Sequence, residues 1–447
     1  MVKNETDYDS QIADLQTVNS KLRKAIARLT AFNKIAAAVC DAHSLEQILD
    51  HIVQDCVTSI GTEQGIIMLP TTKAPYLRAA GNQGNYLKPE LLSRIVPALE
   101  AWTTANRKPL LVNDVQNSNQ FEVPAYCTCD TLLSVPLTLS DNRVGFLALF
   151  NKKGNPGGFT EEDRDMLHNV AAQSIQAIEK FRLLDQETRL LKINEDLAVA
   201  QHIHASLFPV RAPELDGYEV YGKTVQAKDV GGDYFDFIAS DDTRSIICVA
   251  DISGKGLAAA LLMANLQATV RSQTLMRCAT RNCHNNAHRT TACFVENCLE
   301  RINTLFCNST SSEKYATMFY SALDTANHEL TYTNAGHSHP ILFRGIGECE
   351  IMTETGLPIG MFDDVRHESR RINLEPGDTL VICSDGVTES LAGEGDEYGT
   401  DRLIELVQAN RHLSPHLLTD AVLQDLTSFV GPTKQQDDIT VVVLHRT

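Results

Sequence analysis

The alternation of apolar and polar positions separates the 447-residue chain into a mixed region before about residue 184 and a strand-rich region after residue 213. In the first region, short apolar runs predict strands, and apolar positions spaced three or four apart predict helices that bury one face. The expected helices occupy residues 45–60 and 89–104, and the expected strands residues 65–69, 76–80, 132–139 and 144–150. The last two strands flank a Ser-Asp-Asn-Arg turn and are expected to form a β-hairpin. The pattern predicts a compact α/β domain.

A long helix is predicted to follow this domain. Thr160 and Asp163 form a capping-box-like start, and no Gly or Pro interrupts residues 179–207 before Pro209. Within that stretch, apolar residues recur at the spacing of a coiled-coil seam that includes Leu183, Leu190, Ile193 and Leu197. We expect parallel pairing with a second copy of the chain, because an isolated helix with a polar surface gains little stability by itself.

Loose motifs in the first region resemble those of a GAF domain. They are Ser134-Val135-Pro136-Leu137, Gly145-Phe146-Leu147-Ala148-Leu149, Asn151-Lys152 and Phe159-Thr160-Glu161-Glu162-Asp163. The resemblance implies a sensor whose signal is an unknown small molecule or protein. The last two motifs partly match a signature of cyclic-nucleotide-binding members, but Arg164 replaces an acidic residue there. We therefore favour the interpretation that they shape the hairpin and the helix cap.

Acidic residues occur at four strand tips of the second region. These tips carry Asp233, Asp251, Asp385 and the pair Asp437-Asp438. Asp is a poor strand residue, and gathered carboxylates repel one another unless they are protonated or bound to cations. An oxygen-only set without His or Cys at ligand spacing favours Mg²⁺ or Mn²⁺ over zinc. Two such ions about 4 Å apart can hold a bridging hydroxide for in-line attack on a phosphoryl group.

The segment from about residue 200 to 447 resembles the PPM superfamily of metal-dependent serine/threonine phosphatases, and most of all its bacterial RsbU/SpoIIE branch. Besides the acidic turns, the matching motifs are Gln201, Leu207-Phe208-Pro209, Asn334-Ala335-Gly336-His337, Gly356-Leu357-Pro358-Ile359-Gly360 and Leu374-Glu375-Pro376-Gly377-Asp378. The resemblance implies an αββα sandwich with the ions at one edge between its two sheets. The whole chain is therefore expected to be an α+β multidomain protein.

The same resemblance implies a role for each acidic residue. Asp251 would bridge two Mn²⁺ or Mg²⁺ ions, and Asp233 and the Ile252 carbonyl oxygen would bind one of them. Asp385 and Asp437 would hold the second ion, with the neighbouring Asp438 supporting the site by hydrogen bonding. The expected reaction is dephosphorylation of a partner phosphoprotein, an anti-sigma-factor antagonist, by hydroxide held between the ions and without a covalent intermediate.

At some positions near these motifs the sequence departs from the family pattern, and one nearby segment could form a different kind of site. Ser253 stands where eukaryotic relatives carry a His proposed as general acid, so water is expected to protonate the leaving group. No evident Arg stands ahead of the first acidic turn to bind the substrate phosphate, and the nearest bases, Lys223 and Lys228, are interpreted as surface residues. Cysteines and histidines between Cys278 and Cys298 are numerous enough for zinc, but their spacing is not the usual one.

Two reactive side chains in the catalytic region are assigned structural roles. His337, in the Gly-His turn, is expected to be held by hydrogen bonds. Cys383 ends an apolar strand beside Ser384-Asp385 and is expected to be buried packing instead of a nucleophile.

The composition of the chain limits the kinds of partner and the cellular compartment that we expect. The formal net charge of −18 argues against nucleic acid as the main partner, because nucleic-acid-binding surfaces are usually basic. No stretch approaches the roughly 20 apolar residues of a membrane span, so none is expected. The polar N-terminus lacks a signal-peptide core, and the 12 cysteines are scattered. These features predict a cytoplasmic protein.

Four segments are expected along the chain: an N-terminal helix at residues 1–24, a GAF sensor at 25–184, a helical linker and possible dimer coiled coil at 185–210, and a PPM-type phosphatase domain at 211–447. The seam of the first helix fits a coiled coil or an amphipathic helix leading into the sensor. Other functions to consider are an inactive domain that only binds its partner and a sensor whose output is dimerisation. The complete set of ligand positions favours an active phosphatase that the sensor regulates.

Overall fold

The computed structural model describes residues 44–447 except 72–74, 82–88, 122–128, 241–242, 282–289, 312, 346, 394 and 434, and before residue 44 only Leu15 and Val18. The chain divides into two compact units, Met1–Lys192 and Ile193–Thr447. This division falls inside the expected linker. The predicted N-terminal helix lies outside the described residues, apart from the two named positions.

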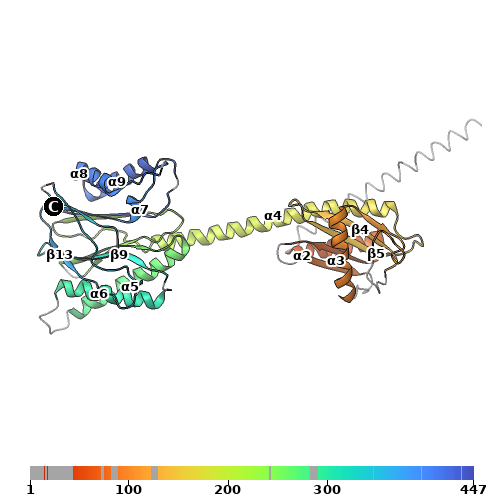
Figure 1. Cartoon of the computed structure of the whole chain (residues 1–447), viewed down its shortest axis with the longest axis horizontal. Helices are drawn as coiled ribbons and strands as arrows, with labels where there is room; N and C mark the ends of the chain where they lie inside the picture. The colour runs from red at the N-terminus through yellow and green to blue at the C-terminus, as the bar shows by residue number, and fades with distance from the viewer. Residues whose placement is uncertain are drawn as a thin grey trace, which may run out of the picture. The chain divides into compact units, whose positions relative to one another are not determined.

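The first unit is built on an antiparallel sheet with strand order β2-β1-β5-β4-β3. Its strands are β1 (Thr62–Leu69), β2 (Tyr76–Gly81), β3 (Leu110–Val112), β4 (Leu132–Thr138) and β5 (Val144–Lys152). Helix α2 (Leu45–Ile60) and the start of α4 (Glu161–Ala205) pack on one face, and α3 (Pro89–Asn106) packs on the other (Figure 1). The predicted helices, strands and hairpin are confirmed. Strand β3 was not predicted.

The predicted helix start is also confirmed, and it joins the hairpin. The hydroxyl of Thr160 accepts a hydrogen bond from the Asp163 backbone N–H (3.2 Å), and the Asp163 carboxylate accepts one from the Thr160 N–H (2.9 Å). Lys152 Nζ, at the end of β5, lies 2.8 Å from Asp163 Oδ1 and donates to the Ile60 carbonyl oxygen. These contacts support the interpretation that the Asn151-Lys152 and Phe159–Asp163 motifs shape the hairpin and the cap.

Helix α4 continues without a break from Glu161 to Ala205. Leu183, Leu190 and Ile193 of the predicted seam are exposed, and Leu197 is half-buried. Within the part of the chain that the structure describes, no helix is long and apolar enough to cross a membrane.

The second unit is an αββα sandwich, as expected. One antiparallel sheet has the order β13-β10-β9-β8-β7 and the other β12-β11-β14-β15-β6. The strands are β6 (Tyr218–Val225), β7 (Tyr234–Ala239), β8 (Arg244–Ile252), β9 (Ala316–Asp324), β10 (Glu329–Ala335), β11 (Ile341–Phe343), β12 (Cys349–Ile351), β13 (Arg370–Asn373), β14 (Thr379–Cys383) and β15 (Ile439–Arg446). Apolar side chains from both sheets fill the space between them.

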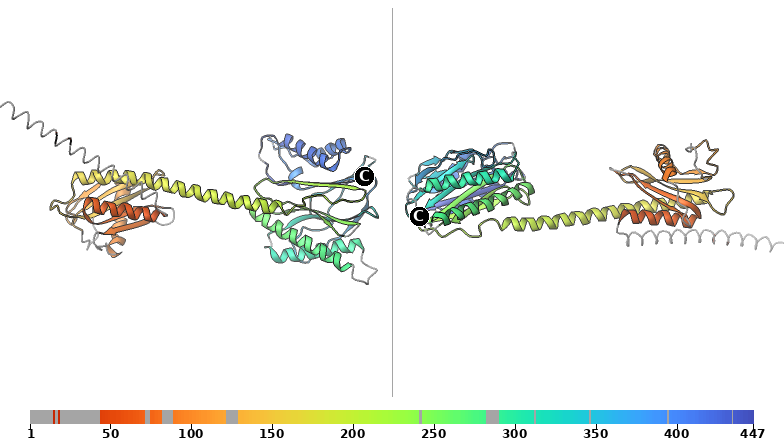
Figure 2. Two further views of the ribbon diagram at one scale, coloured as in Figure 1. Left: turned by 180° about the vertical axis from the view of Figure 1, so that it is seen from behind. Right: turned by 90° about the horizontal axis from the view of Figure 1, so that it is seen from below.

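Helices cover both outer faces of the sandwich. Helices α5 (Leu257–Arg281) and α6 (Thr291–Ser309) pack on the sheet that contains β8, and α8 (Thr400–Asn410) and α9 (Pro415–Val430) pack on the sheet that contains β15. Figure 2 shows these four layers from two further directions. A short helix, α7 (Asp385–Thr388), follows β14 directly.

Candidate active site

The strand register brings the acidic tips together. In the β7–β8 pair, Tyr234 lies opposite Ala250, so Asp233 and Asp251 come next to each other at one end of the first sheet. In the second sheet, Ser384 N–H donates to the Thr440 carbonyl oxygen (3.0 Å), which places Asp385 beside the turn that carries Asp437. The Thr440 hydroxyl also donates to Asp233 Oδ2 (2.5 Å) and joins the two sheet ends.

The electrostatics of the carboxylates show how crowded this edge is. Asp233 is only 2% exposed, and burial raises its pKa to about 7 although Thr440 and Ser384 donate hydrogen bonds to it. Burial, and then repulsion by Asp233, Asp385 and Asp437, raises the pKa of Asp251 to about 9. The pKa of Asp385 is raised by burial and by Asp437. All four predicted carboxylates therefore interact in one place.

The donor chemistry of this cluster fits hard divalent cations. In the described residues, no three His, Cys, Asp or Glu side chains are arranged to hold an ion as they stand. Asp437 pairs with Lys255, and Asp233 accepts a hydrogen bond from Thr440. The four acidic side chains nevertheless offer only oxygen donors, and a positive charge between them would offset their mutual repulsion. The chemistry of the predicted ligands therefore fits Mg²⁺ or Mn²⁺.

Asp438 supports the loop that carries Asp233, as expected. Its carboxylate accepts hydrogen bonds from the backbone N–H of Ala227 (2.8 Å) and of Gly232 (2.7 Å). A Cβ atom at Gly231 would stand 2.1 Å from Asp438 Oδ2, so only glycine fits there. This close approach accounts for Gly231, and a Cβ atom at Gly232 would stand 3.0 Å from the Ile252 carbonyl oxygen.

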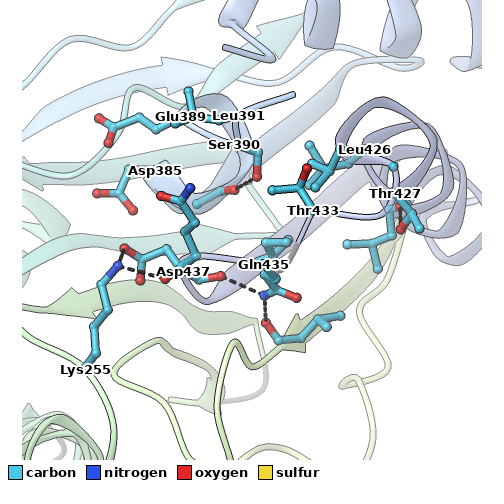
Figure 3. Close-up of a pocket in the computed structure, with 17 residues that line it drawn as sticks. Lys255, Asp385, Glu389, Ser390, Leu391, Leu426, Thr427, Thr433, Gln435 and Asp437 are labelled. Atoms are coloured by element: carbon cyan, nitrogen blue, oxygen red, sulfur yellow. Dashed lines mark hydrogen bonds and ion pairs between the residues drawn. The ribbon is translucent and has the colours of Figure 1, made fainter. Parts of the chain in front are cut away.

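Lys255 is the basic residue that the sequence analysis missed. Its ammonium lies 2.7 Å from Asp437 Oδ2 and donates to the Gln436 carbonyl oxygen at 2.8 Å, as Figure 3 shows. The hydrogen bond with Asp437 raises the pKa of Lys255. Lys223, in contrast, pairs with Asp420 at 2.9 Å, which agrees with its assignment to the surface. The signal for Lys255 was its place between two glycines directly after the Asp251 turn.

The other singled-out side chains are held in structural contacts. His337 is buried, its Nδ1 lies 2.9 Å from Thr317 Oγ1, and burial lowers its pKa to about 4. Cys383 packs in the core beneath α8 and α9. Ser253 Oγ accepts from the Tyr315 N–H (3.1 Å).

The cluster of cysteines and histidines lies mostly outside the described residues. Cys283, His284, His288 and the side chain of Cys278 lie outside what the structure describes. Cys298, on α6, is buried in the core against the first sheet. That burial removes one of the candidate zinc ligands.

A cavity of about 310 Å³ opens beside the carboxylates. Asp385, Asp437 and Lys255 line one end of it, and residues of α9, including Leu426 and Thr427, line the other (Figure 3). A ligand bound at the acidic edge therefore has space next to it.

Each half of the chain matches a known protein family. Residues 241–447 match the family described as Stage II sporulation protein E (SpoIIE), and residues 42–179 match the GAF domain. The two matches lie on the two units of the structure.

Individual relatives are similar over the catalytic half. Protein IcfG of Synechocystis sp. is 25% identical over 264 residues, which cover 56% of this chain and 41% of that protein. Phosphoserine phosphatase RsbU of Bacillus subtilis is 25% identical over 256 residues, covering 57% and 71%. The chain thus spans less than half the length of IcfG. Among solved structures, the SiaA-PP2C domain of Pseudomonas aeruginosa is 19% identical with a TM-score of 0.48, covering 57% of this chain and 98% of that domain.

Proposed function

Because the chain combines a GAF domain with a catalytic domain of the SpoIIE phosphatase type, we propose that it is a metal-dependent protein serine/threonine phosphatase regulated by its GAF domain. The observation that carries this proposal is the convergence of Asp233, Asp251, Asp385 and Asp437 at one edge of the sandwich. Phosphoserine as the substrate is supported by the names of RsbU and RsbP, both phosphoserine phosphatases of Bacillus subtilis.

The proposed roles of the site residues follow the sequence expectation. Asp251, Asp233, the Ile252 carbonyl oxygen, Asp385 and Asp437 would hold two Mn²⁺ or Mg²⁺ ions, with Asp251 shared between them, Asp233 and the Ile252 carbonyl oxygen serving one ion, and Asp385 and Asp437 the other. When bound, the ions supply an activated water and positive charge for the phosphoryl oxygens. We add a role for the ammonium of Lys255, which reaches the same edge and is suited to bind a phosphate oxygen.

Hydrolysis is proposed to proceed without a phosphoenzyme. Asp438 holds the Ala227 and Gly232 N–H groups, which fixes the backbone ahead of Asp233. Cys383, the cysteine next to the acidic tip, faces the core beneath α9 and is remote from solvent. We therefore assign the nucleophile to water.

The proposed substrate is a phosphorylated regulatory protein, of the anti-sigma-factor antagonist kind that the family resemblance implies. We place the protein in the cytoplasm, the compartment in which such a regulatory partner is expected. Its reducing conditions keep free thiols such as those of Cys248 and Cys383, which are buried here, in the reduced form. The GAF unit is proposed to receive the signal, which is an unidentified small molecule or protein.

Helix α4 is proposed to carry that signal as the linker of a parallel homodimer. Leu190 is 61% exposed in the single chain, and Leu183 and Ile193 are similarly uncovered along the seam. A second copy of the helix would bury these side chains. We place the sensor at residues 25–184, the linker at 185–210 and the phosphatase domain at 211–447.

A Mn²⁺-dependent phosphatase assay on the full chain tests the proposed function. Wild-type protein is expected to release phosphate from phosphoserine substrates only when Mn²⁺ or Mg²⁺ is present. The Asp251→Asn variant should be inactive at the same Mn²⁺ concentration. Equal turnover with excess chelator would refute the metal-dependent mechanism, and absence of turnover under all conditions would favour an inactive binding domain.

A further inference from the structure

The cavity beside Asp385 and Asp437 has two chemically different ends. Figure 3 shows Lys255, Asp385, Glu389 and Asp437 gathered at one end, next to the acidic edge. The opposite end is formed by apolar side chains of α9 together with the end of β6. A ligand that reaches from the first end to the second must combine a charged group with an apolar one.

The apolar end consists of aliphatic side chains that other residues leave partly uncovered. Leu423 and Val430 of α9 are half-buried, Leu391 after α7 is also half-buried, and Val225 at the end of β6 is 37% exposed. An exposed valine at a strand end gains stability when a ligand covers it. The four side chains therefore offer a surface for an aliphatic group.

Three polar side chains on the cavity wall, those of Gln435, Ser390 and Thr427, already have partners in the protein. Gln435 Nε2 donates to the carbonyl oxygens of Val225 (2.9 Å) and Asp437 (2.7 Å). The hydroxyls of Ser390 and Thr427 donate to carbonyl oxygens one turn earlier, at 2.6 and 2.7 Å. Because these donors have partners, a bound group gains little by hydrogen bonding to them. The part of the wall that these side chains and the aliphatic residues form consequently favours an apolar occupant.

We infer that this cavity is a specificity subsite that binds an aliphatic side chain adjacent to the phosphoserine of the substrate protein. The inference rests on the proposed phosphatase function. With the phosphate held beside Lys255 at the acidic edge, where divalent cations would offset the charge of Asp385 and Asp437, the next residues of an extended peptide advance about 3.3 Å each, so a neighbouring side chain reaches the cavity. A volume of about 310 Å³ is at the small end of ligand pockets and suits one or two side chains.

The carboxylate of Glu389 at the cavity rim disfavours substrates that carry an acidic residue next to the phosphoserine. Glu389 lines the charged end of the cavity beside Leu391, and it is exposed (Figure 3). A Glu side chain next to the phosphoserine would meet this carboxylate, and like charges in a partly enclosed site repel. The subsite therefore ranks neighbouring residues in the order Leu, Ala, Glu.

Synthetic phosphoserine peptides that differ only in the neighbouring residue test the subsite. Peptides with Leu, Ala or Glu, placed before or after the phosphoserine, are assayed with the full chain and Mn²⁺. We expect kcat/KM for the better-placed Leu peptide to exceed that of its Ala counterpart by about tenfold, which is typical for an aliphatic side chain entering an apolar pocket. The Glu peptide should be poorer than the Ala peptide.

Two variants locate the selectivity in the cavity. Thr427→Trp fills the apolar end and should reduce the Leu/Ala ratio to about one while hydrolysis of the Ala peptide persists. Ser428→Trp, on the adjacent exposed position of α9 outside the cavity, is the matched control and should keep the wild-type ratio. Leu423→Ala enlarges the cavity and should shift the preference from Leu to Phe.

The results of these assays distinguish a failure of the proposed subsite from a failure of the proposed phosphatase function. Equal kcat/KM for all peptides, with Mn²⁺-dependent hydrolysis intact, would overturn the subsite and leave the phosphatase function standing. A full Leu preference in both Thr427→Trp and Leu423→Ala would also overturn it. No metal-dependent hydrolysis of any peptide by the wild-type chain would overturn the function and the subsite together.

Discussion

The imidazole of His204, in the last turn of α4, donates from Nε2 to the carbonyl oxygen of Gly231 at 3.0 Å. Its Nδ1 accepts a hydrogen bond from Gln226 Nε2 at 2.8 Å, and the ring is only 4% exposed. Gly231 stands two residues before Asp233, so the end of the long helix is hydrogen-bonded to the loop that leads to a proposed metal ligand. A displacement of the helix end would therefore move this loop and change the position of Asp233.

Replacing His204 with Ala should weaken metal binding. The change leaves the buried Gly231 carbonyl and the Gln226 amide without their partner, which costs about 1–3 kcal/mol of stability and loosens the loop before Asp233. We expect the Mn²⁺ concentration for half-maximal activity to rise several-fold. Metal titrations of the His204→Ala chain measure this effect. His202→Ala, on an exposed position of the same turn, is the control, and equal Mn²⁺ requirements in both variants would contradict the coupling.

Replacing Asp251 with Asn should abolish activity and also the stabilisation by metal. The wild-type cluster of repelling carboxylates is expected to gain thermal stability when Mn²⁺ is added, because a ligand that binds only the folded state shifts the unfolding equilibrium. Calorimetry with and without Mn²⁺ should show a higher Tm for wild type and little shift for Asp251→Asn. The exposed Asp364→Asn variant should behave as wild type. A wild-type shift in Asp251→Asn would remove Asp251 from the ligand set.

Replacing Cys383 with Ala should cost stability but not chemistry. The side chain is buried in the core beneath α8 and α9, so its loss leaves a small cavity at a cost of roughly 1 kcal/mol. Turnover should stay within a few-fold of wild type, and acid quenching during turnover should trap no phosphorylated protein. Isolation of a phosphocysteine, phosphoserine or phosphoaspartate intermediate would disprove direct attack by water.

The ion pair between Arg244 and Asp324 should stabilise the catalytic unit in a pH-dependent way. Burial would raise the pKa of Asp324, but hydrogen bonds from the Asn327 N–H and from Arg244, whose Nε lies 3.1 Å away, hold that pKa below its ordinary value. A lowered folded pKa gives stability that is present above the unfolded pKa of about 3.9 and is lost as the pH falls through the folded pKa.

We therefore expect Asp324→Ala to lower the free energy of unfolding at pH 7 by about 1–3 kcal/mol, with a smaller difference from wild type below pH 4. Urea unfolding of both proteins across this range, followed through the catalytic unit, measures the difference. A deficit that grows toward acid pH would show that the sign of the linkage is wrong.

Charged residues on the α4 seam should change the assembly state. Leu190→Glu with Leu197→Glu places like charges across the proposed dimer and should produce monomers with altered basal activity, although no site residue is changed. Thr188→Glu with Ala198→Glu adds the same charge to exposed positions outside the seam and should leave the assembly unchanged. Sedimentation and a phosphatase assay report the two properties. If the seam variant is monomeric but keeps wild-type activity and signal response, the linker only connects the two units and the proposed control through dimerisation is wrong.

Local patterns in the sequence were sufficient for most helices and strands of the first unit and for the long helix that follows it. The turn at residues 140–143, the Thr160-Asp163 cap and the uninterrupted helix up to Ala205 each depend on neighbours within one or two turns of chain, so the sequence contains the whole signal. Strand β3, with three residues, is too short to show a periodicity, and it was missed. The acidic tips were also recognisable, because an Asp at the end of an apolar strand stands out locally.

The partners of those tips were decided by the tertiary structure. The Thr440 hydroxyl reaches Asp233 across the two sheets, and Lys255 reaches Asp437 from the turn after β8, although each pair is far apart in the chain. The apolar cavity likewise combines α9 with the end of β6. Such contacts depend on how two sheets stack to bury their shared core, and the free energy of that burial belongs to the whole unit instead of any short segment. The sequence alone therefore determined which residues carry charge at strand ends, and the packing of the sandwich determined which of them meet.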